Sequence, residues 1–177
     1  MAVEPPGTEP CRLRSRMEAE RDAAEPPGTE TEADRGGDGD PLYAIETTIP
    51  LRWRDLDPYG HVNNAVYLTY LEQARDEAIT RLLREALGEV GYVLARVAID
   101  YRRELRQADG PVVVSCRFGR LGGASITTKE TIRTAAGDLA AEAEAVVVKF
   151  DRETRRSQRW TDAERIAFLA AGARPRE

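Results

Sequence analysis

One long helical segment followed by a run of strand-like segments is the feature that most limits how this chain can fold. The helix is predicted over residues 64–87, because Asn64 suits a helix start and Gly88 suits a helix end. Alternating apolar residues predict four strands after it, separated by turns that contain glycine, over residues 92–103, 111–120, 125–134 and 139–150. Helices do not alternate with these strands, so a parallel sheet is not indicated.

Two further segments complete this pattern. Residues 43–53 alternate in the same way and predict a strand before the helix. Thr161 and Glu164 have the spacing of a capping box, which predicts a short helix that ends near Ala171. The fold class is therefore predicted as α+β, with an antiparallel sheet of about five strands around one long central helix, and a short C-terminal helix.

Composition divides the chain into unequal parts. Residues 1–40 contain 11 acidic and 5 basic residues, two copies of EPPGTE and almost no large apolar side chains. Such a segment cannot offset the entropy lost on ordering, so it is predicted to be a disordered tail. Residues 41–172 are predicted to form one folded domain, and residues 173–177 a short C-terminal tail.

Several classes of protein are not indicated by the rest of the composition. Residues 41–177 hold 20 acidic and 21 basic residues, and this near-neutral balance does not suggest nucleic-acid binding. No apolar run approaches the roughly 20 residues that span a bilayer, so membrane insertion is not expected. One histidine and two separated cysteines give no metal-ligand spacing, and we expect neither a metal nor a bound cofactor. The same two cysteines exclude a disulfide framework and favour a cytoplasmic location.

The apolar face of the long helix carries two charges. Most apolar residues of the helix share one face in projection, namely Tyr67, Leu68, Leu71, Ala74, Ala78, Ile79, Leu82, Leu83 and Ala86. Glu72 and Arg75 fall within this face, where charged groups are rarely buried unless they are paired. One interpretation is an ion pair between these two residues, which are three positions apart. The alternative places Glu72 in an active site, as a base or as an orienting group, because it lies about two turns from the helix start.

The connector before the helix carries a family motif. DLDPYGHVNN, at residues 55–64, is followed by AVYLxYLExAR, at residues 65–75. This stretch resembles hotdog-fold thioesterases of the 4-hydroxybenzoyl-CoA thioesterase type, and it is also similar to plant acyl-ACP thioesterases. The resemblance covers most of residues 45–159. It implies a hotdog fold, in which a curved antiparallel sheet wraps one helix and two copies build two shared active sites.

The resemblance also implies the activity and the partners. We expect hydrolysis of an acyl-CoA or acyl carrier protein thioester by a homodimer or homotetramer, with coenzyme A entering only as part of the substrate. It places the catalytic carboxylate at Asp57, as base or nucleophile, and the polarising backbone amide near Asn64. Both roles suit the chemistry, because a carboxylate can activate water and the free N–H groups of a helix start can stabilise an oxyanion.

The remaining residues of the connector have alternative interpretations. In the acyl-ACP thioesterases the residue that matches His61 is proposed to be catalytic together with an Asn, but Tyr59 stands where that Asn is expected. His61 is therefore either catalytic or a structural hydrogen-bonding group. Asn63 is either the helix cap or a substrate contact, and Asp55 is expected to fix the loop. Substrate contacts are expected from Tyr59, Gly60, Val62, Asn63 and Tyr67.

Other functions on the same fold stay open. The spacing of Asp57 and His61 is reminiscent of hotdog enoyl hydratases and dehydratases, although the rest of the motif favours thioesterases. A non-catalytic acyl-CoA-binding module is the other alternative. Arginines at positions 102, 103, 106, 152, 155, 156 and 159 are either contacts for the phosphates of coenzyme A or solvated strand ends.

Overall fold

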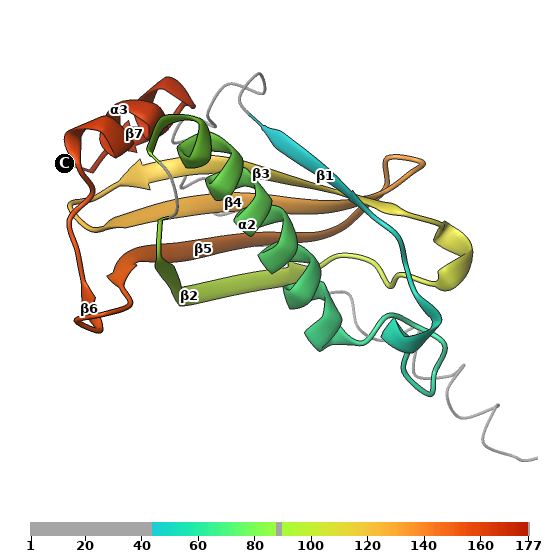
Figure 1. The fold of residues 1–177 in the computed structure, drawn as a ribbon. Coiled ribbons are helices and arrows are strands. Elements are labelled where there is room, and N and C mark those ends of the chain that lie inside the picture. Colours follow the sequence, from blue (N-terminus) through green and yellow to red (C-terminus); the bar gives the residue numbers. More distant parts are fainter. Residues whose placement is uncertain (1–43, 88–89, 177) are drawn as a thin grey trace, which may run out of the picture. The chain divides into compact units, whose positions relative to one another are not determined.

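A computed structural model describes residues 44–87 and 90–176 of the chain (Figure 1). The main strands are β1 (Ile45–Ile49), β2 (Tyr92–Tyr101), β3 (Val112–Leu121), β4 (Ser125–Thr134) and β5 (Leu139–Asp151). They form an antiparallel sheet in the order β1-β3-β4-β5-β2. Two short strands extend it, since β6 (Arg156–Ser157) pairs with β5 and β7 (Arg174–Pro175) pairs in parallel with β3.

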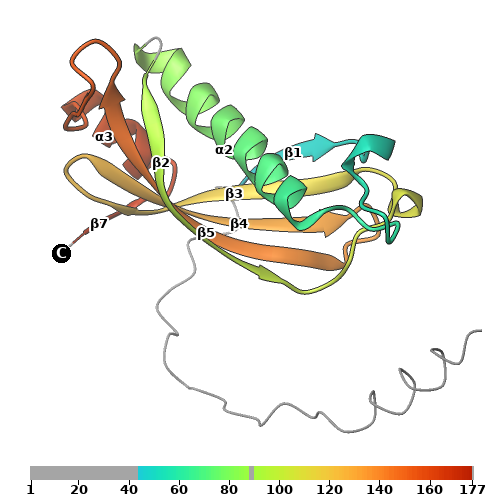
Figure 2. The same cartoon turned by 90° about the horizontal axis from the view of Figure 1, so that it is seen from below.

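The helix α2 (Asn64–Leu87) crosses one face of this sheet, and the sheet curves around it (Figure 2). A second helix, α3 (Asp162–Ala170), lies beside the far end of α2. Two single-turn 3-10 helices, η2 (Trp53–Asp55) and η3 (Gln107–Asp109), occur in the connections. The predicted α+β architecture, with an antiparallel sheet around one long helix, is confirmed.

The buried face of α2 differs from its predicted apolar face at three positions. Tyr70 is fully buried, whereas Leu68, placed in the apolar face by projection, is 36% exposed. Glu72 is also exposed, and Arg75 is buried. The sheet covers the side of the helix that carries Tyr70 and Arg75, so this contact decides which residues are buried.

The predicted ion pair between Glu72 and Arg75 is wrong. Arg75 instead donates from Nε and Nη2 to the two carboxylate oxygens of Glu130 on β4, at 2.7 and 2.9 Å. Thr128 also donates to Glu130, at 2.6 Å. Both charges are buried. The bidentate ion pair and the Thr128 hydroxyl supply the hydrogen bonds that offset the cost of removing the carboxylate from water.

The first strand is shorter than predicted. β1 ends at Ile49, immediately before Pro50, because proline has no N–H to donate to the ladder. The chain then turns into η2, and Trp53 is 79% exposed instead of facing the core. This early end of the strand leaves residues 50–63 as the connector that leads into α2.

The C-terminal segment packs against the sheet through α3 and β7. The predicted capping box is confirmed: Thr161 accepts from the Glu164 N–H at 3.3 Å, and Glu164 accepts from the Thr161 N–H at 2.6 Å. Lys149 donates to both oxygens of Glu164 at 2.7 Å, which ties α3 to β5. Ala173 is buried and β7 pairs with β3, so the segment predicted as a C-terminal tail contributes to the sheet.

Some predictions lie outside the described residues. The tail at 1–40 and the helix stop at Gly88 belong to this group. Within the described ranges, no helix has an apolar stretch long enough to cross a membrane.

Candidate active site

The connector between β1 and α2 is fixed at its start by Asp55. This buried carboxylate accepts hydrogen bonds from the Tyr70 hydroxyl at 2.7 Å and from the Arg52 N–H and Nε at 3.0 and 3.1 Å. Burial acts to raise the pKa of Asp55, but the hydrogen bonds from Tyr70 and Arg52 outweigh it and lower the pKa. Asp55 is thus a charged anchor of the loop, as the sequence predicted.

Asp57 lies in a tight turn that leaves its carboxylate partly accessible. Its Oδ1 accepts from the backbone N–H of Tyr59 at 2.9 Å and of His61 at 3.3 Å. Gly60 closes the turn with a φ of +79° and donates its N–H to the Asp57 carbonyl at 3.0 Å. Glycine tolerates this left-handed backbone without strain. The turn therefore holds Asp57 in one orientation through one of its oxygens.

The start of α2 offers a free backbone donor close by in the chain. Asn63 caps the helix, since its side-chain oxygen accepts from the Ala65 N–H at 2.9 Å and its carbonyl accepts from the Val66 N–H at 2.8 Å. Among the described residues, none accepts from the Asn64 N–H. Such an unpaired N–H at the positive end of a helix can stabilise a developing oxyanion. The capping interpretation of Asn63 is confirmed, and its contact with substrate stays a prediction.

His61 contacts Glu104, which lies between β2 and η3. The distance from His61 Nε2 to Glu104 Oε2 is 2.9 Å, and the two side chains are 32% and 47% exposed. Glu104 therefore orients the imidazole without burying it. This contact fits the structural interpretation of His61, and a catalytic role for His61 stays a prediction.

Two of the expected substrate contacts are buried. Val62 and Tyr67 are each 2% exposed and belong to the core cluster under the loop. The Tyr67 hydroxyl donates to the Arg103 carbonyl at 3.1 Å, and burial raises the pKa of Tyr67 to about 12. Tyr59, by contrast, is 83% exposed at the surface of the turn. Tyr59, Gly60 and Asn63 are therefore the accessible members of the predicted contact set.

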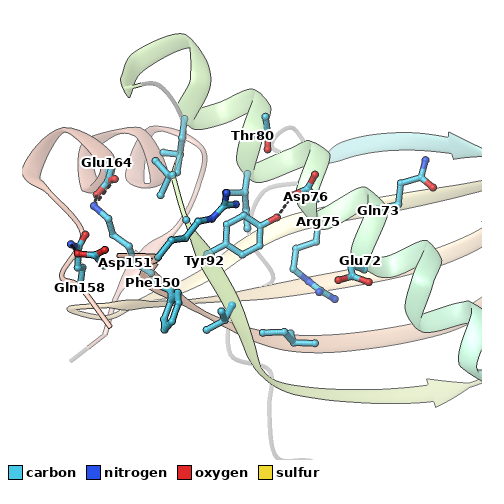
Figure 3. Close-up of a pocket in the computed structure, with 18 of the residues that line it drawn as sticks. Glu72, Gln73, Arg75, Asp76, Thr80, Tyr92, Phe150, Asp151, Gln158 and Glu164 are labelled. Carbon is cyan, nitrogen blue, oxygen red and sulfur yellow. Dashed lines mark hydrogen bonds and ion pairs between the residues drawn. The ribbon is translucent and has the colours of Figure 1, made fainter. Parts of the chain in front are cut away.

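Glu72 opens on a separate groove (Figure 3). The groove has a volume of about 1180 Å³ and lies between α2, the first residues of β2 and the end of β5. Glu72, Asp76 and Thr80 line it from α2, and Asp76 accepts a short hydrogen bond from Tyr92. Burial, followed by this hydrogen bond, raises the pKa of Tyr92. The structure does not bring Glu72 into the Asp57 turn, since Glu72 lines the groove from α2 and Asp57 belongs to the connector.

The sequence patterns did not predict this groove. Its only signal is the spacing of Glu72, Asp76 and Thr80, which stand four residues apart and therefore share one side of a helix. The walls contributed by β2 and β5 are distant in the chain and give no such signal.

Three of the arginines considered for phosphate binding are already paired. Arg102 contacts Glu142 at 3.0 Å, Arg103 contacts Asp109 at 2.9 Å, and Arg106 donates to Glu104 at 2.8 Å. These three side chains form ion pairs at the surface, which agrees with their interpretation as solvated residues at strand ends. The described residues contain no group of three or more His, Cys, Asp or Glu that could hold a metal ion.

Comparisons with known proteins agree on one family. The model of the thioesterase-like superfamily matches residues 51–169. The long-chain acyl-CoA thioesterase FadM of Escherichia coli is 28% identical over 117 residues, which cover 64% of this chain and 88% of FadM. A thioesterase of Thermus thermophilus, solved in complex with coenzyme A and zinc, is 34% identical with a TM-score of 0.62. That match covers 72% of this chain and 92% of the Thermus protein.

Proposed function

We propose that this chain, which belongs to the thioesterase-like superfamily, hydrolyses the thioester of an acyl-CoA with Asp57 as its catalytic carboxylate. Family membership confirms the hotdog fold that the motif predicted and makes the chain a thioester hydrolase. We infer the roles of individual residues from the geometry of the connector. The observation that carries them is a partly exposed carboxylate, held by one oxygen, in the same short loop as the free N–H of Asn64.

The reaction follows from these two groups. Asp57 removes a proton from a water molecule, whose oxygen forms a bond to the thioester carbonyl carbon. The Asn64 N–H donates a hydrogen bond to the carbonyl oxygen as negative charge develops on it. The C–S bond then breaks, and the departing thiolate takes up the proton held by Asp57. The products are a free acid and coenzyme A.

A second copy of the chain would complete the site. β2 is an edge strand of the sheet, and among the described strands only β5 pairs with it. Val93 and Leu94 on this edge are 41% and 47% exposed, and an exposed apolar edge strand favours pairing with another strand. Antiparallel pairing of β2 with its own copy would therefore create a homodimer.

This pairing would also explain the separation of the connector from the groove. Tyr101, the last residue of β2, donates to the Asn64 carbonyl at 3.1 Å, so the connector lies at the C-terminal end of β2. Tyr92, Val93 and Leu94 line the groove, which therefore lies at the N-terminal end. In an antiparallel pair these ends are neighbours, so the connector of one copy would face the groove and Glu72 of the other. We propose that this groove receives part of the substrate, and that Glu72 acts there as an auxiliary group.

The test is thiol release from a panel of acyl-CoA and acyl carrier protein thioesters. Asp57→Asn keeps the Oδ1 acceptor of the turn but loses the base, so we expect turnover to fall by about 100-fold or more. Asp138→Asn, at an exposed turn between β4 and β5, is the matched control and should keep its rate. Unchanged turnover in Asp57→Asn would move the catalytic role to Glu72 or His61. No turnover by the wild type, with tight acyl-CoA binding, would instead favour the binding module.

Oxygen labelling distinguishes the two roles of the carboxylate. In heavy-oxygen water, a base mechanism puts the label into the acid released in the first turnover. Direct attack by Asp57 on the carbonyl carbon would expel the thiolate and form a mixed anhydride. Water that opens this anhydride at the Asp57 carbonyl carbon would leave an unlabelled carboxylate oxygen in that acid. We expect the label in the first turnover.

A further inference from the structure

We propose that a pocket next to α3 binds a phosphate-bearing ligand through Arg159, Arg165 and Arg176. The pocket has a volume of about 480 Å³ and lies between the turn from β3 to β4, the start of α3 and the end of β7. Figure 1 shows that α3 and β7, which adjoin it, lie at the opposite end of α2 from the connector, and α2 is about 36 Å long. The pocket is therefore separate from the Asp57 turn of the same chain.

The three guanidinium groups lack acidic partners. Among the described residues, no carboxylate lies within ion-pair distance of Arg159, Arg165 or Arg176. The Arg165 side chain donates to the Gly122 carbonyl at 2.8 Å, and it has no other hydrogen bond within the described part of the chain. Asp162 is the one acidic residue in the lining, so the pocket walls carry two net positive charges. Like charges gathered around a hollow repel one another, and an anion removes this repulsion.

Backbone hydrogen bonds hold the segments that carry two of the arginines. The Trp160 N–H donates to the Gly123 carbonyl at 2.9 Å, next to Arg159. The Arg176 N–H donates to the Leu121 carbonyl at 3.0 Å, which anchors the third arginine to β3. Segments that are already held in the bound arrangement lose little freedom on binding.

The chemistry of the three arginines suits phosphate. The arginine side chain offers a planar fork of donors that matches phosphate oxygens. Phosphate is thus the chemistry that three arginines around one pocket recognise. Two sources fit: the nucleotide part of a coenzyme A thioester, or a separate phosphorylated metabolite.

Calorimetric titration of the full chain with inorganic pyrophosphate tests the site directly. Arg159→Gln with Arg176→Gln removes two exposed guanidinium groups and leaves Arg165 bonded to Gly122. We expect this double variant to lose about tenfold or more in pyrophosphate affinity, and added salt to weaken wild-type binding. Arg102→Gln with Arg106→Gln is the matched control, because it removes two charges that have carboxylate partners. The control should bind pyrophosphate within about twofold of the wild type.

Substrates with and without the nucleotide identify the source. If the double variant raises KM for an acyl-CoA but not for the same acyl group on pantetheine, the pocket holds the nucleotide of the substrate. If neither KM changes while pyrophosphate binding is lost, the pocket holds a separate ligand. Equal pyrophosphate binding by the double variant and the wild type, or none by either, would overturn the site. Since the titration needs no turnover, it stands whether or not the proposed thioesterase mechanism does.

Discussion

The Tyr70 hydroxyl donates a hydrogen bond of 2.7 Å to Asp55, and so a residue in the second turn of α2 holds the loop that carries Asp57. Both residues are buried, and Arg52 completes the set of donors around the same carboxylate oxygen. Asp57 follows two residues later, and its turn also depends on the pairing of Leu56 with Val62. The position of the proposed catalytic group is thus set by a buried tyrosine with no part in the chemistry.

Tyr70→Phe should destabilise the protein in a pH-dependent way. A hydrogen bond to a charged group contributes about 1.5–3 kcal/mol, and we expect the free energy of unfolding to fall by that amount at neutral pH. The folded pKa of Asp55 is lowered, so its contribution is present above the unfolded value of about 3.9 and is lost as the pH falls through the folded value. Urea titrations near pH 7 and pH 3.5 should show a smaller difference at the lower pH. A larger difference at the lower pH would contradict this account of Asp55.

Glu130→Gln should destabilise the protein more than most surface changes. It leaves the Arg75 guanidinium buried without its counter-charge, which costs about 3–5 kcal/mol. Arg75→Met combined with Glu130→Gln removes both charges and should recover part of that loss. Urea unfolding of the two single variants and the double variant measures this coupling. Additive losses would show that the pair does not interact.

His61→Ala should lower kcat/KM less than Asp57→Asn does. The imidazole is held by Glu104 and partly exposed, so we expect a fall of about tenfold, equivalent to about 1.4 kcal/mol of transition-state stabilisation. Stability should change by less than about 1 kcal/mol, because exposed ion pairs contribute little. Glu104→Gln serves as the comparison, since it keeps the imidazole but removes its charged partner. A loss as large as that of Asp57→Asn would make His61 the principal catalytic group.

Leu94→Asp should dissociate the proposed dimer. Leu94 is 47% exposed in the single chain, so a charge there is tolerated unless another copy covers it. We expect sedimentation velocity to show dimers for the wild type and monomers for the variant, with a matching loss of turnover. Ile166→Asp on α3, at a position 67% exposed, is the control and should remain dimeric. Dimers in both variants would exclude the β2 edge as the interface.

Most of the architecture could be predicted from local patterns. The bounds of α2 and β4 match the predicted segments because Asn63 and Asn64 mark a helix start, and alternation is regular from Ser125 to Thr134. The capping box at Thr161 could also be predicted, since both of its residues lie within one helical turn. These features depend on residues close together in the chain.

Features that depend on residues far apart in the chain could not be predicted from local patterns. Glu130, the partner of Arg75, lies on a strand far along the chain, and no spacing rule connects them. Leu68 is exposed although it belongs to an apolar stripe, because the sheet covers a neighbouring side of α2. The roles of Asp57, His61 and Asn64 rest on the motif and the local geometry, and they stay predictions until turnover is measured.

The order of the strands has a consequence for how the protein folds. β3, β4 and β5 form hairpins between neighbours in the chain, so their pairing closes only short loops. β1 pairs with β3 across the whole of α2 and β2, and this contact closes a much longer loop. We expect the hairpins to form early and β1 to dock late. The connector follows β1, so catalytic competence should be among the last properties that a refolding chain recovers.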